Sequence, residues 1–90
     1  MKFLSLVFFH DPGHGWLRVP LQVLDELNVQ GDISPCSYMD GDFAYLEEDC
    51  DCGVFTTAAK AAGYELSITD EYQENTPIRS MACYSSTATV

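Results

Sequence analysis

Basic residues are scarce in this 90-residue chain. Four Lys and Arg face 14 Asp and Glu, which gives a formal net charge of −10 at pH 7. Proteins bind nucleic acids by displacing condensed counterions with Lys and Arg, and four cations cannot form a positive surface for phosphates. An anionic membrane surface repels the same charge. The composition therefore excludes direct binding to DNA or RNA and argues against a membrane surface as the partner.

Long apolar runs are also missing. The first run, Phe3 to Phe9, is interrupted by Ser5 and ended by His10, Asp11 and Pro12, so it is far shorter than the span of about 20 residues that crosses a membrane. The sequence has neither the strongly basic start nor the small-residue cleavage site of a signal peptide. We therefore expect a cytoplasmic protein with reduced thiols.

The apolar pattern predicts one small α+β domain over residues 1–84, followed by a flexible tail over 85–90. Both faces of the segment 3–9 are apolar, which is typical of a strand in the middle of a sheet. Residues 64–69 alternate apolar and polar side chains, as in a half-buried strand. The segment 35–39 begins with proline and is predicted as an edge strand. The predicted strands are residues 3–9, 16–19, 35–39, 43–46, 64–69 and 77–84.

Two segments have the periodicity of helices. Leucines recur at helical spacing after Pro20, which suits the first turn of a helix. An apolar stripe from Phe55 to Ala62 ends at Gly63, a plausible left-handed stop, and Asp49 or Asp51 can cap the start of this helix. The predicted helices are residues 20–28 and 51–62. The fold class is therefore α+β in the order ββα-ββα-ββ, an antiparallel sheet with two helices packed on it.

Six of the twelve residues from 40 to 51 are acidic and none is basic. The plain interpretation is a solvated face with helix capping. The alternative is a recognition surface, because carboxylates without cations attract basic partners over long distances. Every second residue of a strand lies about 6.6 to 6.8 Å along the chain, close to twice the 3.4 Å phosphate rise of a DNA strand, so such a surface could imitate a nucleic-acid backbone. The predicted partner-binding residues are Asp40, Asp42, Glu47, Glu48, Asp49 and Asp51, with Trp16 and Tyr45 as apolar anchors.

The four cysteines and two histidines are enough to bind zinc, but their spacing is unlike a zinc site. Cys50 and Cys52 are closer in sequence than the usual pairs, and Cys36 and Cys83 stand alone. The acidic segment also lacks the glycine and glutamate positions of a calcium loop. We therefore expect no metal and no cofactor. The alternative is a zinc-stabilised interaction module in which Cys50, Cys52 and one or two of Cys36, Cys83, His10 and His14 hold the ion.

His10, Asp11 and His14 are the nearest approach to a catalytic group, because a histidine beside a carboxylate can act as a general base. The chain has no Gly-x-Ser-x-Gly, no His-x-Glu with Cys-x-x-Cys, and no phosphate-binding loop. Turn chemistry is enough to explain the two glycines around His14. We therefore expect a protein that is not an enzyme.

Three strings carry a resemblance: HGWLxVP from His14 to Pro20, SPxSY from Ser34 to Tyr38, and GDxxYLEEDCD from Gly41 to Asp51. Over about residues 3–84 the chain resembles a family of small uncharacterised proteins from bacteriophages, prophages and plasmids. The resemblance implies an accessory protein of a mobile element. Small acidic proteins of that origin include anti-CRISPR and anti-restriction inhibitors, which are similar to this chain in size and charge.

The resemblance and the charge together lead to one functional expectation. We expect the protein to bind the basic surface of a host nucleic-acid-binding defence complex and to inhibit it by occupying the nucleic-acid groove. The site of action is then the cytoplasm of the host cell. An uncovered sheet edge would also allow a homodimer.

Overall fold

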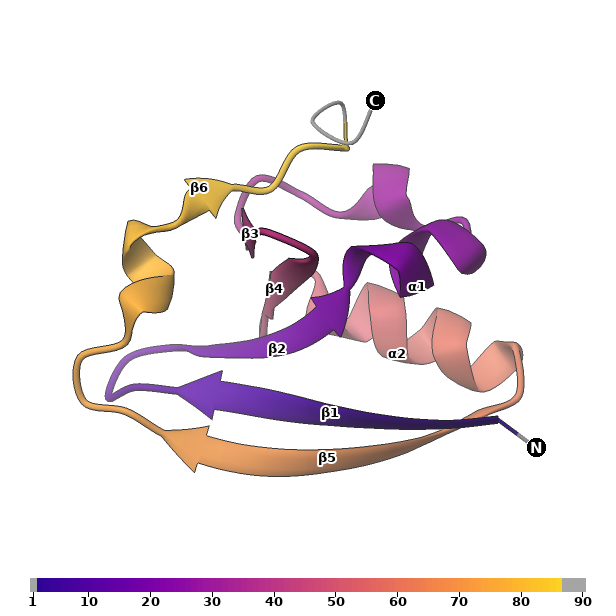
Figure 1. The fold of residues 1–90 in the computed structure, drawn as a ribbon, viewed down its shortest axis with the longest axis horizontal. Helices are drawn as coiled ribbons and strands as arrows, with labels where there is room; N and C mark the ends of the chain where they lie inside the picture. The colour runs from indigo at the N-terminus through magenta and orange to yellow at the C-terminus, as the bar shows by residue number, and fades with distance from the viewer. Residues whose placement is uncertain (1, 87–90) are drawn as a thin grey trace.

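The computed structural model describes residues 2–86 (Figure 1). These residues form an α+β domain with one six-stranded sheet and two α-helices. The elements are β1 (Lys2–His10), β2 (Gly15–Pro20), α1 (Leu21–Glu26), η1 (Gln30–Asp32), β3 (Tyr38–Asp40), β4 (Phe43–Glu47), α2 (Cys52–Ala61), β5 (Tyr64–Tyr72), η2 (Pro77–Ser80) and β6 (Ala82–Cys83), where η marks a 3-10 helix.

The sheet has the strand order β5-β1-β2-β4-β3-β6. Four neighbouring pairs are antiparallel, but β1 and β5 are parallel over nine residues, from Lys2 opposite Tyr64 to His10 opposite Tyr72. The prediction of a purely antiparallel sheet is therefore wrong. The reason is that α2 carries the chain back along the sheet between β4 and β5, and a helical crossover of this kind joins strands that run in the same direction.

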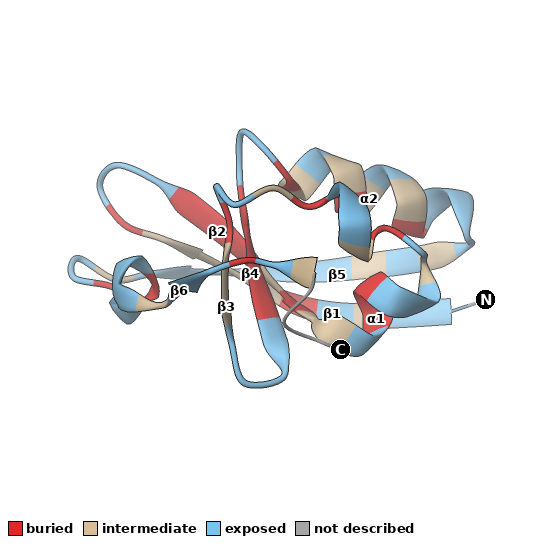
Figure 2. Ribbon diagram, turned by 90° about the horizontal axis from the view of Figure 1, so that it is seen from above, coloured by how far each residue is buried: buried red, intermediate tan, exposed pale blue. Residues whose placement is uncertain are grey.

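The main core lies between the helices and one face of the sheet. Phe55 of α2 and Leu24 of α1 are fully buried and belong to the same apolar cluster as Leu17, Val19 and Leu46 of the central strands. Figure 2 shows buried segments along β2 and β4 and on both helices. The period-two pattern of the strands thus places alternate side chains against the helical layer.

A smaller apolar cluster covers part of the opposite face. Trp16 and Tyr45 project there from β2 and β4, and Ile78 of η2 packs on them with 2% of its surface exposed. The segment 77–84 is therefore not the strand that its sequence predicted, because only Ala82 and Cys83 pair with β3. Thr76 accepts a hydrogen bond from the N–H of Ile78, and the proline between them has no N–H to offer a sheet, so a helical turn forms instead.

The sequence locates both α-helices within two residues of their observed ends. In the part of the chain that the structure describes, no helix is long and apolar enough to span a membrane. The predicted edge strand 35–39 is wrong in position, because β3 begins only at Tyr38 and lies between β4 and β6. Residues 35–37 form a turn that Ser37 anchors. Of the predicted tail 85–90, residues 87–90 lie outside the described part, and the N–H of Ser85 donates to Met39 Sδ at 3.3 Å.

Gly15 is required by close packing within the first hairpin. A Cβ atom at this position would lie 2.3 Å from the Phe8 ring, whereas a Cβ at Gly31 would meet no atom within 4 Å. We expect Gly15→Ala to lower the free energy of unfolding by about 1 to 3 kcal/mol, because the ring must leave its place against the core. Denaturant unfolding measures the change, with Gly31→Ala as the control. Equal stabilities of the two variants would contradict this account of the hairpin.

Candidate functional site

Asp51 is the centre of a buried hydrogen-bond network. It stands immediately before α2, but its carboxylate caps no helix N–H. Instead it accepts hydrogen bonds from the N–H of Ser34 at 3.0 Å, the Ser34 hydroxyl at 2.8 Å and the Ser37 hydroxyl. With 2% of its surface exposed, Asp51 cannot contact a partner in this conformation, so its place among the predicted partner-binding residues needs correction.

Glu47 is a second buried carboxylate with a structural role. Its Oε1 atom accepts the N–H groups of Asp49 at 2.9 Å and Cys50 at 3.0 Å, and its backbone N–H donates to Ser37. Its other oxygen lies 3.6 Å from Nδ1 of His14. Glu47 therefore holds the turn between β4 and α2 and presents little surface to a partner.

The two predicted apolar anchors are also covered. Trp16 exposes 2% of its surface and Tyr45 exposes 9%. Ile78 packs on both side chains, and the Arg79 guanidinium lies 5.4 Å from the centre of the Trp16 ring. These two residues thus belong to the second apolar cluster, because a short 3-10 helix occupies the space that a partner would need.

The predicted residues that remain accessible form two separate groups. Asp40 and Asp42 flank the turn between β3 and β4, and Glu48 and Asp49 follow the other end of β4. The five residues of β4 separate the groups by roughly 17 Å. The acidic segment from 40 to 51 is therefore two exposed pairs joined by a strand whose own acidic residue is buried.

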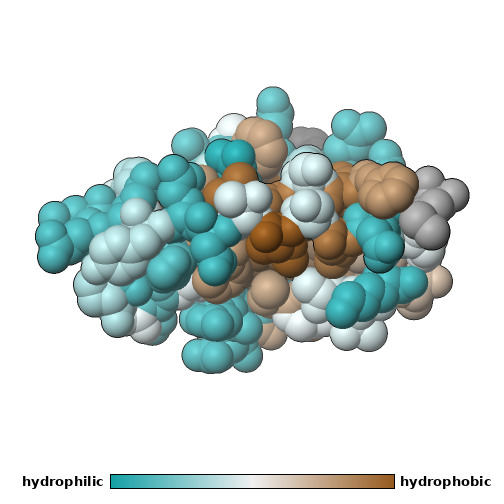
Figure 3. Space-filling model, turned by 90° about the horizontal axis from the view of Figure 1, so that it is seen from below, coloured by the Kyte–Doolittle hydropathy of each residue, from teal (hydrophilic) through white to brown (hydrophobic). Residues whose placement is uncertain are grey.

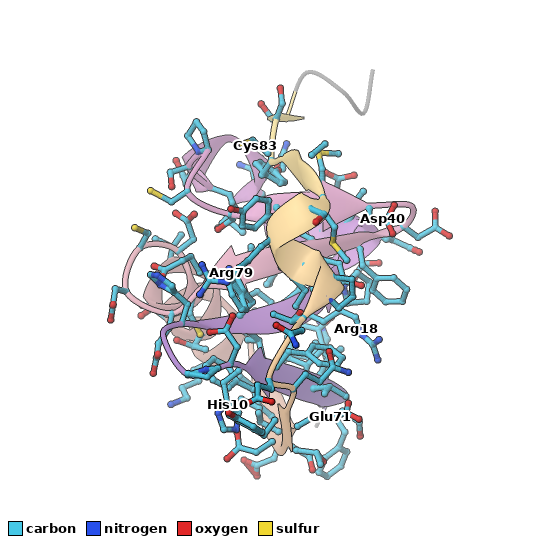
Figure 4. All side chains as sticks on the ribbon, turned by 90° about the vertical axis from the view of Figure 1, so that its left-hand side faces the viewer. His10, Arg18, Asp40, Glu71, Arg79 and Cys83 are labelled. Atoms are coloured by element: carbon cyan, nitrogen blue, oxygen red, sulfur yellow. The ribbon has the colours of Figure 1, made fainter. Side chains whose placement is uncertain are left out.

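Asp11 is the one carboxylate paired with Lys or Arg in residues 2–86. Arg79 Nε lies 2.7 Å from Asp11 Oδ2, and Nη2 lies 3.1 Å from Oδ1. Figure 4 shows Arg79 beside η2. Lys2 and Arg18 lie over aromatic rings instead, at 5.1 to 5.2 Å from their centres. All carboxylates other than Asp11, Glu47 and Asp51 are exposed. These eleven are Asp25, Glu26, Asp32, Asp40, Asp42, Glu48, Asp49, Glu65, Asp70, Glu71 and Glu74.

The candidate catalytic turn is organised around Asp11, and its carboxylate is fully engaged. Asp11 Oδ1 accepts the N–H groups of Gly13 at 2.9 Å and His14 at 2.8 Å, while Arg79 binds both oxygens. The His10 ring packs against Tyr72 at 5.3 Å between ring centres. The turn borders an open hollow of about 310 Å³. The partners of the Asp11 carboxylate in the described residues are thus Arg79 and two backbone N–H groups, and neither imidazole.

The cysteines do not converge with histidines on a metal site. Within the described residues, no three His, Cys, Asp or Glu side chains are arranged to hold a metal ion. A hydrogen bond with the Cys36 thiol, together with burial and Glu47, raises the pKa of Cys50 to about 12. Metal ions bind the thiolate form, so the raised pKa of Cys50 disfavours metal binding there. Residues 2–86 therefore do not form the zinc site of the alternative interpretation.

The Asp11–Arg79 pair makes stability depend on pH. The hydrogen bond from Arg79, together with the two backbone N–H groups, holds the pKa of Asp11 well below its ordinary value of 3.8. A carboxylate with a lowered pKa in the folded state stabilises the fold above about pH 4 and loses this contribution as the pH falls further. We expect Asp11→Asn to lower the melting temperature at pH 7 and to flatten its decline below pH 4.

Thermal unfolding between pH 2.5 and 7 measures this dependence, and Asp32→Asn is the control. Asp32 is exposed, and its carboxylate has no hydrogen bond or ion pair in the described residues. An acid profile of Asp11→Asn as steep as that of the unchanged chain would show that the pair does not control this transition.

Sequence reasoning missed the partners of the buried carboxylates. Arg79 lies 68 residues from Asp11, and Ser34 lies 17 residues from Asp51. Neither separation leaves a local signal in the sequence. Comparison of the chain with protein families, curated proteins and solved structures found no match.

Proposed function

We propose that the protein is a non-enzymatic binding protein that docks on the basic surface of a nucleic-acid-binding protein. The family resemblance suggests a mobile-element protein acting in the cytoplasm of a host cell, with a CRISPR or restriction complex as its target. Inhibition then results from occupation of the nucleic-acid groove. The observation that carries the proposal is the set of eleven exposed carboxylates without a Lys or Arg partner in residues 2–86.

The charge distribution supports binding because unpaired negative charges destabilise the isolated protein. Unpaired charges of one sign repel one another and destabilise a compact fold, while they accelerate encounters with a surface of opposite sign. The four cations offset only four of the 14 negative charges, and just one of them binds a carboxylate within residues 2–86. A partner rich in Lys and Arg would supply the missing counter-charges.

The exposed pairs at the two ends of β4 are the proposed contacts. Glu48 and Asp49 lie on a turn that the buried Glu47 holds in place, so their backbone is ordered before a partner arrives. Asp40 and Asp42 lie at the other end, next to Phe43, which exposes 37% of its surface. Phe43 thus replaces Trp16 and Tyr45 as the proposed apolar anchor.

The test is inhibition of DNA cleavage by a panel of purified CRISPR effectors and restriction endonucleases at 0.1 M salt. We expect inhibition of at least one enzyme, and we expect Glu48→Lys with Asp49→Lys to weaken it about tenfold or more through lost Coulomb attraction. The control is Glu26→Lys with Asp32→Lys, which changes the net charge equally on another part of the surface.

Inhibition that survives the change at Glu48 and Asp49, or that both double variants weaken equally, would exclude this surface as the contact. Failure to inhibit any enzyme of the panel would contradict the proposed target class.

A further inference from the structure

β5 forms a long free edge of the sheet. It has nine residues, pairs with β1 on one side, and is the last strand in the sheet order. Figure 1 shows it along one side of the molecule, next to β1. Backbone N–H and C=O groups on the outer side of an edge strand have no partner in the sheet and can pair with another strand.

This edge lacks most of the features that keep edge strands from pairing. Tyr64–Tyr72 contains no proline and no lysine, and its register with β1 runs over all nine residues without a bulge. Ile68 exposes 46% of its surface and Tyr72 exposes 55%. The other edge of the sheet is β6, which has just two residues. The two edges thus differ sharply, and β5 alone offers a template of useful length.

The side of the molecule that includes this edge has an apolar centre between polar ends. Figure 3 shows apolar side chains gathered in the middle of this side of the molecule, with polar groups toward both ends. Leu66 packs partly against the main core, and Ile68 follows it on the same face of the strand. Glu65 and Glu71 alternate with them on the opposite face. A strand added here would meet an apolar centre on one face and a carboxylate toward each end of the other.

We propose that the free edge of β5 binds an extended basic segment of another protein, which adds to the sheet as a further strand. Glu65, Asp70 and Glu71 are exposed, and none has an ion pair within residues 2–86. Lysine or arginine opposite Glu65 and Glu71 would form cross-strand pairs of opposite charge, and apolar side chains opposite Leu66 and Ile68 would extend the apolar centre.

A second copy of this chain is a poorer occupant of the edge. Antiparallel pairing of the whole strand with its copy places Glu65 of each chain opposite Glu71 of the other, and like charges opposite one another are destabilising. Two chains that each carry a net charge of −10 also repel. Charge complementarity therefore selects a basic segment. Asp70 and Glu48 line the same open hollow, but Glu65 and the outer edge of β5 do not border it. Variants at Glu65 and Glu71 therefore test this proposal separately from variants at Glu48 and Asp49.

The probe is a fluorescently labelled nine-residue peptide designed for antiparallel pairing. It carries lysines opposite Glu65, Asp70 and Glu71, and valines opposite Leu66 and Ile68. Two control peptides have the same lysines, one in scrambled order and one with proline at the centre, which removes a ladder hydrogen bond. Fluorescence anisotropy at 0.1 M salt measures binding, and amide chemical shifts of the full chain locate it.

We expect the designed peptide to bind more tightly than both controls and to shift amides of residues 64–72. Glu65→Lys with Glu71→Lys should weaken binding about tenfold, because each favourable cross-strand pair becomes a repulsive one. Glu26→Lys with Asp32→Lys, which makes the same change in net charge elsewhere, should alter binding less than twofold.

Three results would overturn the proposal. The first is equal binding of the designed, scrambled and proline peptides, which would indicate attraction by net charge alone. The second is a set of shifted amides around Asp40 or Glu48 in place of β5. The third is sedimentation of the unliganded chain as a dimer whose interface maps to residues 64–72, which would make a second copy the occupant.

Discussion

A shortage of cations constrains how this protein can fold. Burying a carboxylate is costly unless charged or hydrogen-bonding groups compensate for the lost water. One Arg serves this purpose for Asp11, and no further Lys or Arg binds a carboxylate in residues 2–86. Asp51 and Glu47 are satisfied instead by hydroxyl and backbone N–H groups, which stabilise an anion without an opposite charge. These bonds join the turn before β3, the end of β4 and the start of α2.

The same constraint explains the chemical character of the surface. The Arg18 guanidinium lies over the rings of Phe9 and Phe43. Its positive charge therefore interacts with aromatic rings on this face of the sheet and not with a carboxylate. The eleven exposed carboxylates consequently have no Lys or Arg partner within residues 2–86. Two sets of them coincide with structural features suited to contact: the ordered turn after β4 and the long free edge of β5. The first set underlies the proposed function, and the second underlies the proposed binding of a basic strand.

The sequence predicts the elements well where local periodicity determines them. The doubly apolar segment of β1, the alternation at the start of β5 and the stripe of α2 identify two strands and a helix in their observed places. Alternation does not reveal the direction of the partner strand, which is why the parallel pairing of β1 with β5 was missed. At Pro77 the local signal was misread, because a proline after a threonine starts a helical turn as readily as a strand.

The candidate site could be predicted only in part, for a related reason. Composition and spacing located the acidic segment, but burial of an individual carboxylate depends on groups that are distant in sequence. Asp51 is buried because Ser34 and Ser37 fold back on it, and Trp16 is covered because η2 returns to the sheet after more than 60 residues. Glu47 is buried at the end of β4, whereas Glu48 and Asp49 are exposed in the turn that follows. No residue pattern in the sequence distinguishes the buried carboxylate from the two exposed ones.

The most direct test of this account is the unfolding free energy of single variants in which a carboxylate becomes an amide. The account predicts that Asp51→Asn and Glu47→Gln each lower it by about 1 to 3 kcal/mol, because buried donors lose a charged acceptor. Asp40→Asn, Glu48→Gln and Glu71→Gln should leave it unchanged within about 0.5 kcal/mol or raise it by reducing repulsion. If neutralising any of these three exposed residues destabilises the fold as much as Asp51→Asn does, the division into structural and free carboxylates is contradicted.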